Sequence, residues 1–277
     1  MILEAETGSG KTEAALWRYA QLFEAGRVDG LYFAVPTRAA AVQLHGRVAA
    51  ASRRLFGEAD PQAILAVPGY LRAGSTEGTP LPHWKVRWDD EKDTDEGTLV
   101  ARWAAENSKR YLAAQIAVGT VDQAMLGALM VKHAHMRTAA LSRSLLVIDE
   151  VHASDRFMTA IQKRLLEAHL AVGGYAMLMS ATLGSTARAA WLRQQEPSFE
   201  EAVATPYPAV RAVSEPVPRS PRVPSIHKKR VSMQTLPTWR FAGPLYPGNK
   251  LTQFARHEPN LARTPQMACA LMRCLSE

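Results

Sequence analysis

The chain has 277 residues, of which 47% are hydrophobic, and it carries a formal net charge of +7. This length allows one large domain or two small ones, and the composition is ordinary for a globular protein. No apolar run approaches the roughly 20 residues that a membrane span needs, and the N-terminus lacks the basic-then-apolar pattern of a signal peptide. The two cysteines, Cys269 and Cys274, do not form a Cys-x-x-Cys pair, so no metal or redox framework is indicated. We therefore expect a cytoplasmic protein without a membrane partner.

The positive charge is concentrated at the C-terminal end. Residues 215–277 hold ten Lys/Arg and three Asp/Glu, and the other 23 basic and 23 acidic residues lie in 1–214. The first 214 residues are therefore neutral overall. The net charge of the chain does not indicate that its folded part binds nucleic acid.

Short apolar runs alternate with helix-length segments through most of the chain. Strands separated by helices predict an α/β fold with a mostly parallel central sheet flanked by helices on both faces. In such sheets ligands bind beyond the carboxyl ends of the strands. The predicted strands are Ile2–Ala5, Leu31–Val35, Ile64–Val67, Ile116–Val118, Leu145–Ile148 and Ala176–Met179. The predicted helices are Lys11–Glu24, Ala39–Leu55, Leu99–Asn107, Asp122–Val131, Asp155–Val172 and Ser185–Gln195.

Two stretches break this alternation. Residues 69–97 are rich in Gly, Pro, Trp and acids, and we interpret them as a surface insertion, either a loop held by its two tryptophans or a contact for a partner. Nine of the 17 prolines lie beyond residue 214, and this segment is predicted to be extended or disordered. We therefore divide the chain into a domain of residues 1–213 and a Pro-rich basic tail of residues 214–277.

A glycine-rich loop, AETGSGKT at Ala5–Thr12, follows the first strand and opens the first helix. Its glycines let several backbone N–H groups face one anion, and the helix adds the positive end of its dipole. The lysine would reach the outer phosphates of a nucleotide, and the threonine hydroxyl would ligate magnesium. The predicted phosphate-binding residues are Glu6, Thr7, Gly8, Ser9, Gly10, Lys11 and Thr12.

Two adjacent carboxylates, Asp149 and Glu150, follow the predicted strand Leu145–Ile148. Asp149 would hold magnesium, and Glu150 would polarise the attacking water as general base. The alternative is an acidic helix start, which the helix dipole favours. The phosphate loop far upstream makes the catalytic interpretation the better one.

Ser180-Ala181-Thr182 follows the strand Ala176–Met179. Its two hydroxyls could hydrogen-bond to the cluster of Asp149 and His152 and so report the state of the nucleotide to another surface. A Ser/Thr helix cap is the alternative.

Two further polar motifs follow strands and suit contacts with a phosphodiester backbone without base readout. The first is Pro36, Thr37 and Arg38, and the second contains Gly119, Thr120 and Asp122. For Thr120 and Asp122, helix capping is the alternative.

Taken in order, AETGSGKT, PTRAAAVQL, VGTVDQAM, DEVH and SATLG make the chain resemble the first motor domain of superfamily 2 helicases. The phrases IAVGTVDQAML, VKHAHMR, LLVIDEVHASD and ATPYPAV resemble most closely the CRISPR-associated helicase–nuclease of type I systems. The resemblance covers roughly residues 1–213.

The resemblance implies a RecA-like domain that belongs to an antiviral DNA helicase. Such a domain would bind ATP, Mg²⁺ and single-stranded DNA. ATP would contact the phosphate loop, Thr12 and Asp149 would hold magnesium, and Glu150 with Lys11 would serve hydrolysis. His152, Ser180 and Thr182 would couple nucleotide to DNA. A CRISPR surveillance complex and a chain supplying a second RecA-like domain are the implied partners. A non-catalytic nucleotide-dependent DNA-binding module and an RNA helicase domain are the alternative functions.

Three parts of such helicases have no counterpart in this sequence: the nuclease domain, the upstream adenine contacts and the second RecA-like domain with its arginine finger. We therefore expect a truncated or frameshifted fragment that binds ATP·Mg but hydrolyses it poorly.

Overall fold

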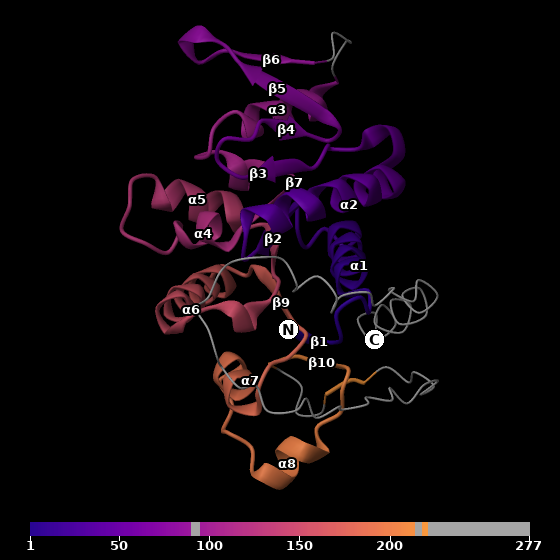
Figure 1. Ribbon diagram of the computed structural model, residues 1–277, viewed down its shortest axis with the longest axis vertical. Coiled ribbons are helices and arrows are strands. Elements are labelled where there is room, and N and C mark those ends of the chain that lie inside the picture. Colours follow the sequence, from indigo (N-terminus) through magenta and orange to yellow (C-terminus); the bar gives the residue numbers. More distant parts are fainter. Residues whose placement is uncertain (90–94, 214–217, 221–277) are drawn as a thin grey trace, which may run out of the picture.

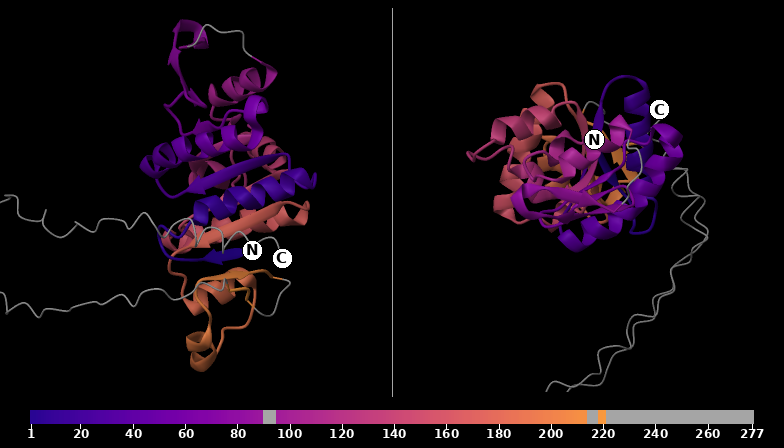
Figure 2. Two further views of the ribbon diagram at one scale, coloured as in Figure 1. Left: turned by 90° about the vertical axis from the view of Figure 1, so that its right-hand side faces the viewer. Right: turned by 90° about the horizontal axis from the view of Figure 1, so that it is seen from above.

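The computed structural model describes residues 1–89, 95–213 and 218–220, and every structural statement below concerns these residues. They form a ten-stranded sheet in the order β10-β1-β9-β8-β2-β7-β3-β4-β5-β6 (Figure 1). The strands lie across the long axis of the molecule, from the β5–β6 hairpin at one end to α8 at the other (Figure 2).

The six central strands are parallel to one another, and all six were predicted from the sequence. Their register places the carboxyl ends of neighbouring strands at one common edge. They are β1 (Ile2–Glu4), β2 (Gly30–Val35), β3 (Ile64–Ala66), β7 (Ile116–Thr120), β8 (Ser144–Ile148) and β9 (Tyr175–Ser180). The predicted α/β fold with a mostly parallel sheet is confirmed.

Helices cover both faces of the sheet, because alternate side chains of each buried strand point to opposite faces. Helices α1 and α2 pack with Leu31 and Phe33 on one face. Helices α3 to α7 lie on the other face, where Tyr32 and Ala34 point. The helices are α1 (Lys11–Glu24), α2 (Arg38–Phe56), α3 (Glu96–Ala105), α4 (Val121–Met125), α5 (Ala134–Leu141), α6 (Arg156–Ala171), α7 (Ser185–Leu192) and α8 (Phe199–Ala204).

One predicted helix is shorter than expected, and the helix after it was not predicted. The expected helix Asp122–Val131 ends at Met125, and α5 starts at Ala134. The Thr138 hydroxyl of α5 donates to the Gly127 carbonyl at 2.8 Å. This contact holds the intervening turn against α5, so tertiary packing overrides the helix propensity of the segment.

The surface insertion of residues 69–97 is not a simple loop. It contains β4 (Arg72–Ala73), β5 (Thr76–Pro80) and β6 (Val86–Trp88), which extend the sheet by antiparallel pairing. Trp88 packs its ring under the Arg102 guanidinium of α3, 5.2 Å from the ring centroid. These strands lack the continuous apolar runs by which the parallel strands were found.

The other end of the sheet also carries a strand that was not predicted. β10 (Ala209–Arg211) pairs antiparallel with β1. Val210 also forms an isolated antiparallel β-bridge with Arg219. Apart from residues 218–220, the tail predicted to be extended or disordered lies outside the described residues. No described helix is long and apolar enough to cross a membrane.

Candidate nucleotide site

Three of the predicted motifs meet at one edge of the sheet. β9 lies between β1 and β8 and is parallel to both. The segments at the carboxyl ends of these strands are therefore neighbours: the phosphate loop after β1, Ser180–Thr182 at the end of β9 and Asp149–His152 after β8. Sequence separations of more than 100 residues are closed by strand pairing alone.

The phosphate loop has the backbone shape that its glycines predict. Gly8 and Gly10 have φ of 79° and 94°, in the left-handed region that favours glycine. Gly10 is the N-cap of α1 and provides no side-chain cap, so the first N–H groups of the helix are directed into the loop. The Ser9 hydroxyl is buried and has no hydrogen-bond partner in the described residues. A phosphate oxygen is the kind of partner that this loop can take.

Lys11 lies inside the loop rather than in solvent. Its side chain is largely buried, and the Nζ ammonium donates to the carbonyls of Ala5 at 2.8 Å and Glu6 at 3.2 Å. Burial lowers the pKa of Lys11, while the charges of Asp149 and Glu150 act in the opposite direction. The lysine and the acidic pair stand at the same edge of the sheet, because β9 is parallel to both β1 and β8 and lies between them.

The acidic pair is held by a strained turn. Glu150 has φ of 51°, an uncommon conformation for a residue with a Cβ that recurs at functional sites. The Asp149 carboxylate accepts from the Glu150 N–H at 2.9 Å. Burial raises the pKa of Asp149, and the neighbouring Glu150 raises it further. A cation beside Asp149 would relieve this electrostatic cost.

The predicted coupling residues are in contact. His152 Nδ1 hydrogen-bonds to Ser180 Oγ at 2.8 Å and lies 3.3 Å from Glu150 Oε2. The same Ser180 Oγ accepts from the Thr182 N–H at 3.1 Å. The alternative of a helix cap does not describe this arrangement, because α7 begins at Ser185 with Gly184 as its N-cap.

The predicted nucleic-acid residues lie at the same sheet edge, in the last two residues of β7 and directly after β2 and β7. Val35 pairs with Thr120, so the two motifs are adjacent. Thr37 caps α2 by accepting from the Ala40 N–H at 3.1 Å, while Arg38 and Asp122 are exposed. Pro36 is partly buried and stands between β2 and this cap.

Gly119 and Thr120 are buried in β7. A Cβ on Gly119 would lie 2.5 Å from the Tyr32 hydroxyl and 2.6 Å from the Ala66 carbonyl oxygen. The Thr120 carbonyl accepts from that same tyrosine hydroxyl at 3.0 Å. Thr120 is the N-cap of α4 but makes no side-chain cap bond. These two residues therefore have a packing role, and a contact with nucleic acid stays a prediction for all six.

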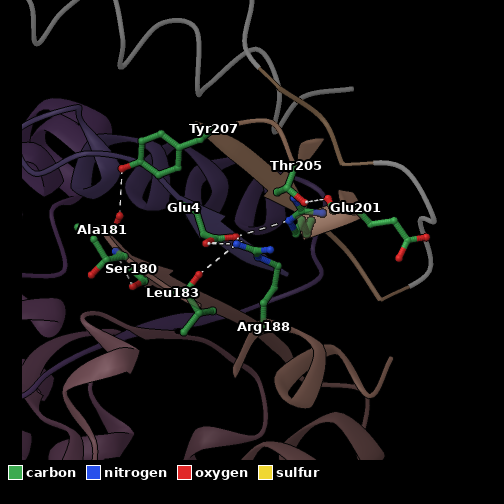
Figure 3. Close-up of polar contacts among 10 residues, drawn as sticks. Glu4, Ser180, Ala181, Leu183, Arg188, Glu201, Thr205 and Tyr207 are labelled. Carbon is green, nitrogen blue, oxygen red and sulfur yellow. Dashed lines mark hydrogen bonds and ion pairs between the residues drawn. The ribbon is translucent and has the colours of Figure 1, made fainter. Parts of the chain in front are cut away.

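An ion-pair network at Glu4, the last residue of β1, was not predicted from the sequence (Figure 3). Glu4 is only 3% exposed, and its carboxylate binds Arg188 through two contacts, at 2.6 and 3.1 Å. Arg211 Nε lies farther away, 3.5 Å from the same carboxylate. An acidic residue inside an apolar strand was the available signal, because a buried carboxylate needs a cationic partner.

A parallel sheet with a glycine-rich phosphate loop, an acidic pair and a Ser-Ala-Thr segment at one edge defines a RecA-like domain of the superfamily 2 helicase class. No family model matches the sequence. It is 36% identical over 183 residues to the CRISPR-associated endonuclease/helicase Cas3 of Escherichia coli K12, covering 66% of this chain and 20% of that protein. It is 34% identical over 238 residues to Cas3 of Thermus thermophilus. That match covers 85% of this chain and 25% of the relative.

Solved structures agree with the sequence relatives. The crystal structure of T. fusca Cas3-AMPPNP matches 75% of this chain and 22% of its own, with a TM-score of 0.56 and 27% identity. The T. fusca Cas3-ATP structure matches with a TM-score of 0.56 and 28% sequence identity. The chain therefore corresponds to a helicase domain of the Cas3 family, and it spans a quarter or less of the length of the curated relatives named above.

Proposed function

We propose that this chain is the ATP-binding domain of a Cas3-type DNA helicase, with the motor domain in residues 1–213 and a separate tail in 214–277. The observation that carries the proposal is the parallel strand order β1-β9-β8, because the phosphate loop with Lys11 follows β1 and the acidic pair follows β8 at the same edge of the sheet. Structures of relatives named as complexes with AMPPNP, ADP and ATP support it.

In this proposal the phosphates of ATP lie in the loop Glu6–Thr12. Backbone N–H groups at the start of α1 and the Ser9 hydroxyl donate to phosphate oxygens, and Lys11 exchanges its loop carbonyls for the outer phosphates. Thr12 and Asp149 hold Mg²⁺. The described residues contain no cluster of three or more His, Cys, Asp or Glu that could hold a metal, so phosphate and water oxygens complete the coordination, as is usual for this ion.

Glu150 orients the attacking water, and His152 and Ser180 connect it to Thr182. Turnover by residues 1–213 alone is expected to be slow, because an arginine finger in the site of such motor domains typically raises the rate by about 10³–10⁵. A second RecA-like domain that provides this arginine is therefore a proposed partner. Recruitment by a CRISPR surveillance complex, for defence against viral DNA, is proposed on the family relationship alone.

Single-stranded DNA is the proposed polymer, with its backbone along Pro36–Arg38 and Gly119–Asp122. Arg38 provides an exposed positive charge there. DNA-stimulated rather than RNA-stimulated hydrolysis in a reconstituted two-domain form would separate this function from that of an RNA helicase. Nucleotide-dependent DNA binding without any turnover in that form would instead favour a non-catalytic module.

Titration with a fluorescent ATP analogue and Mg²⁺ tests the core of the proposal. Lys11→Ala should weaken binding at least tenfold, because the charged contact to the outer phosphates is lost. Lys109→Ala removes an exposed lysine outside the site and should leave the affinity unchanged. Equal affinities of wild type and Lys11→Ala would refute the nucleotide site.

A further inference from the structure

We propose that Tyr207 is a positioning residue that ties the Ser180–Thr182 loop to the segment 205–211, so that a change at the nucleotide site is carried to that segment. The inference rests on the proposed ATP site and adds a residue to which neither the sequence motifs nor the fold assigned a role. Tyr207 itself does not touch the reacting atoms.

An unbroken series of polar contacts leads from the proposed general base to the loop that Tyr207 holds. Glu150 lies beside His152, His152 bonds to Ser180 Oγ, and that oxygen also accepts from the Thr182 N–H. Between these two residues, the Ala181 carbonyl accepts from the Tyr207 hydroxyl at 3.0 Å (Figure 3). A shift of the loop therefore acts directly on Tyr207.

The Tyr207 hydroxyl is a dependable donor at neutral pH. Partial burial, together with the negative charges of Glu6 and Glu4, raises the pKa of Tyr207 to about 12. The hydroxyl thus keeps its proton, and the Ala181 carbonyl can only accept. Because β10 pairs antiparallel with β1, with Ala209 opposite Glu4, Tyr207 lies at the end of β1 that leads into the phosphate loop.

The segment that holds Tyr207 connects to the last described residues of the chain. Immediately after it, the Pro208 carbonyl accepts from the Ser220 hydroxyl at 2.8 Å, and Val210 exchanges two backbone hydrogen bonds with Arg219. On its other side β10 pairs with β1, with Ala209 opposite Glu4. Residues 205–211 thus join the nucleotide edge of the sheet to residues 218–220.

A tyrosine that merely stabilises a surface loop would make the same hydrogen bond. The test must therefore measure whether nucleotide binding changes residues 205–211 and whether that change depends on Tyr207. Loss of one neutral hydrogen bond costs about 1 kcal/mol, which corresponds to roughly a fivefold increase in local opening. Tyr207→Phe keeps the ring of this half-exposed side chain and removes only the hydroxyl. Tyr70→Phe is a matched control, because Tyr70 has similar exposure, 42% against 48%, and lies between β3 and β4.

Hydrogen–deuterium exchange of the 277-residue chain, with and without AMPPNP·Mg, measures both parts of the proposal. Without nucleotide, Tyr207→Phe should accelerate exchange about fivefold in the peptide containing Thr182. In wild type and Tyr70→Phe, AMPPNP should change the exchange of residues 205–211. In Tyr207→Phe this response should be lost, while AMPPNP affinity stays within about twofold.

Two results would overturn the coupling, and they differ in their bearing on the ATP site. If Tyr207→Phe binds AMPPNP and residues 205–211 respond as in wild type, Tyr207 does not transmit and the ATP site stands. If wild type binds AMPPNP no better than Lys11→Ala, the ATP site is refuted, and the coupling with it.

Discussion

The two halves of the carboxyl edge of the sheet differ in how their charged side chains are exposed. The first half lies at the ends of β1, β9 and β8, and the second at the ends of β2 and β7. At the ends of β1, β9 and β8 several charged groups are buried or in mutual contact, although Glu6 is exposed. Lys11 lies in its loop, Asp149 is partly buried and Glu4 binds Arg188. Beyond β2 and β7 the charged groups, Arg38 and Asp122, are exposed. The first arrangement suits a small, highly charged ligand that replaces water, and the second suits an extended polymer that stays partly solvated.

The largest expected effect concerns the ion-pair network of the first half. Glu4→Ala leaves Arg188 and Arg211 with an uncompensated buried charge and should lower the free energy of unfolding by about 3–5 kcal/mol. Glu77→Ala breaks an exposed pair with Arg72 in the β4–β5 extension and should cost less than about 1 kcal/mol. Urea denaturation measures both, and similar losses for the two variants would contradict the distinction.

The second effect tests whether Gly119 has a packing role in the other half. Gly119→Ala places a Cβ against the Tyr32 hydroxyl and the Ala66 backbone and should destabilise by about 1–3 kcal/mol. Gly46→Ala, within α2 and with open space around its Cβ position, should stabilise by about 0.5–1 kcal/mol. Thermal unfolding of the two variants would show opposite shifts, and a neutral Gly119→Ala would remove the packing role.

The third effect concerns Asp149, whose side chain is partly buried. The folded-state pKa of Asp149 lies above the ordinary 3.8, so the folded chain holds this proton more tightly than the unfolded chain does. Ionised Asp149 therefore destabilises the fold at neutral pH, and this penalty fades as the pH falls through the folded-state pKa. In EDTA, Asp149→Asn should be more stable than wild type by about 0.5–2 kcal/mol at pH 7, with a smaller advantage near pH 4.

Asp122→Asn provides the control for Asp149→Asn. Asp122 is exposed in the first turn of α4, where a negative charge is mildly favourable, so its removal should cost a few tenths of a kcal/mol. A stabilising Asp122→Asn, or a destabilising Asp149→Asn, would reverse the expected contrast between the two halves.

The smallest effect concerns the solvated half. Arg38→Ala should weaken single-stranded DNA binding modestly and reduce the salt dependence by one phosphate contact, a slope change of about 0.7. Unfolding should be unchanged. Arg54→Ala, exposed at the other end of α2, is the control, and fluorescence anisotropy over a salt series is the measurement. Equal slopes in both variants would exclude Arg38 from the DNA path.

Sequence patterns predicted the part of the molecule that depends on local composition. The predicted runs Leu31–Val35 of β2 and Leu145–Ile148 of β8 consist of aliphatic and aromatic residues, because parallel strands are buried on both faces. Each run is followed by a polar motif where the chain leaves the sheet. The phosphate loop was recognisable because few residue combinations give both the turn and the helix start. The short strands β4, β5, β6 and β10 lacked such runs and were missed.

The sequence by itself determined the parallel α/β framework and which residues stand at the carboxyl ends of its strands, because side-chain alternation, burial and glycine conformation act over a few neighbouring residues. Only the tertiary structure decided which of those residues meet. The pairing of Glu4 with Arg188, the bond from Tyr207 to Ala181 and the close approach of Gly119 to Tyr32 depend on strand order. Strand order is set by how the whole sheet buries its apolar surface, and no local pattern encodes it.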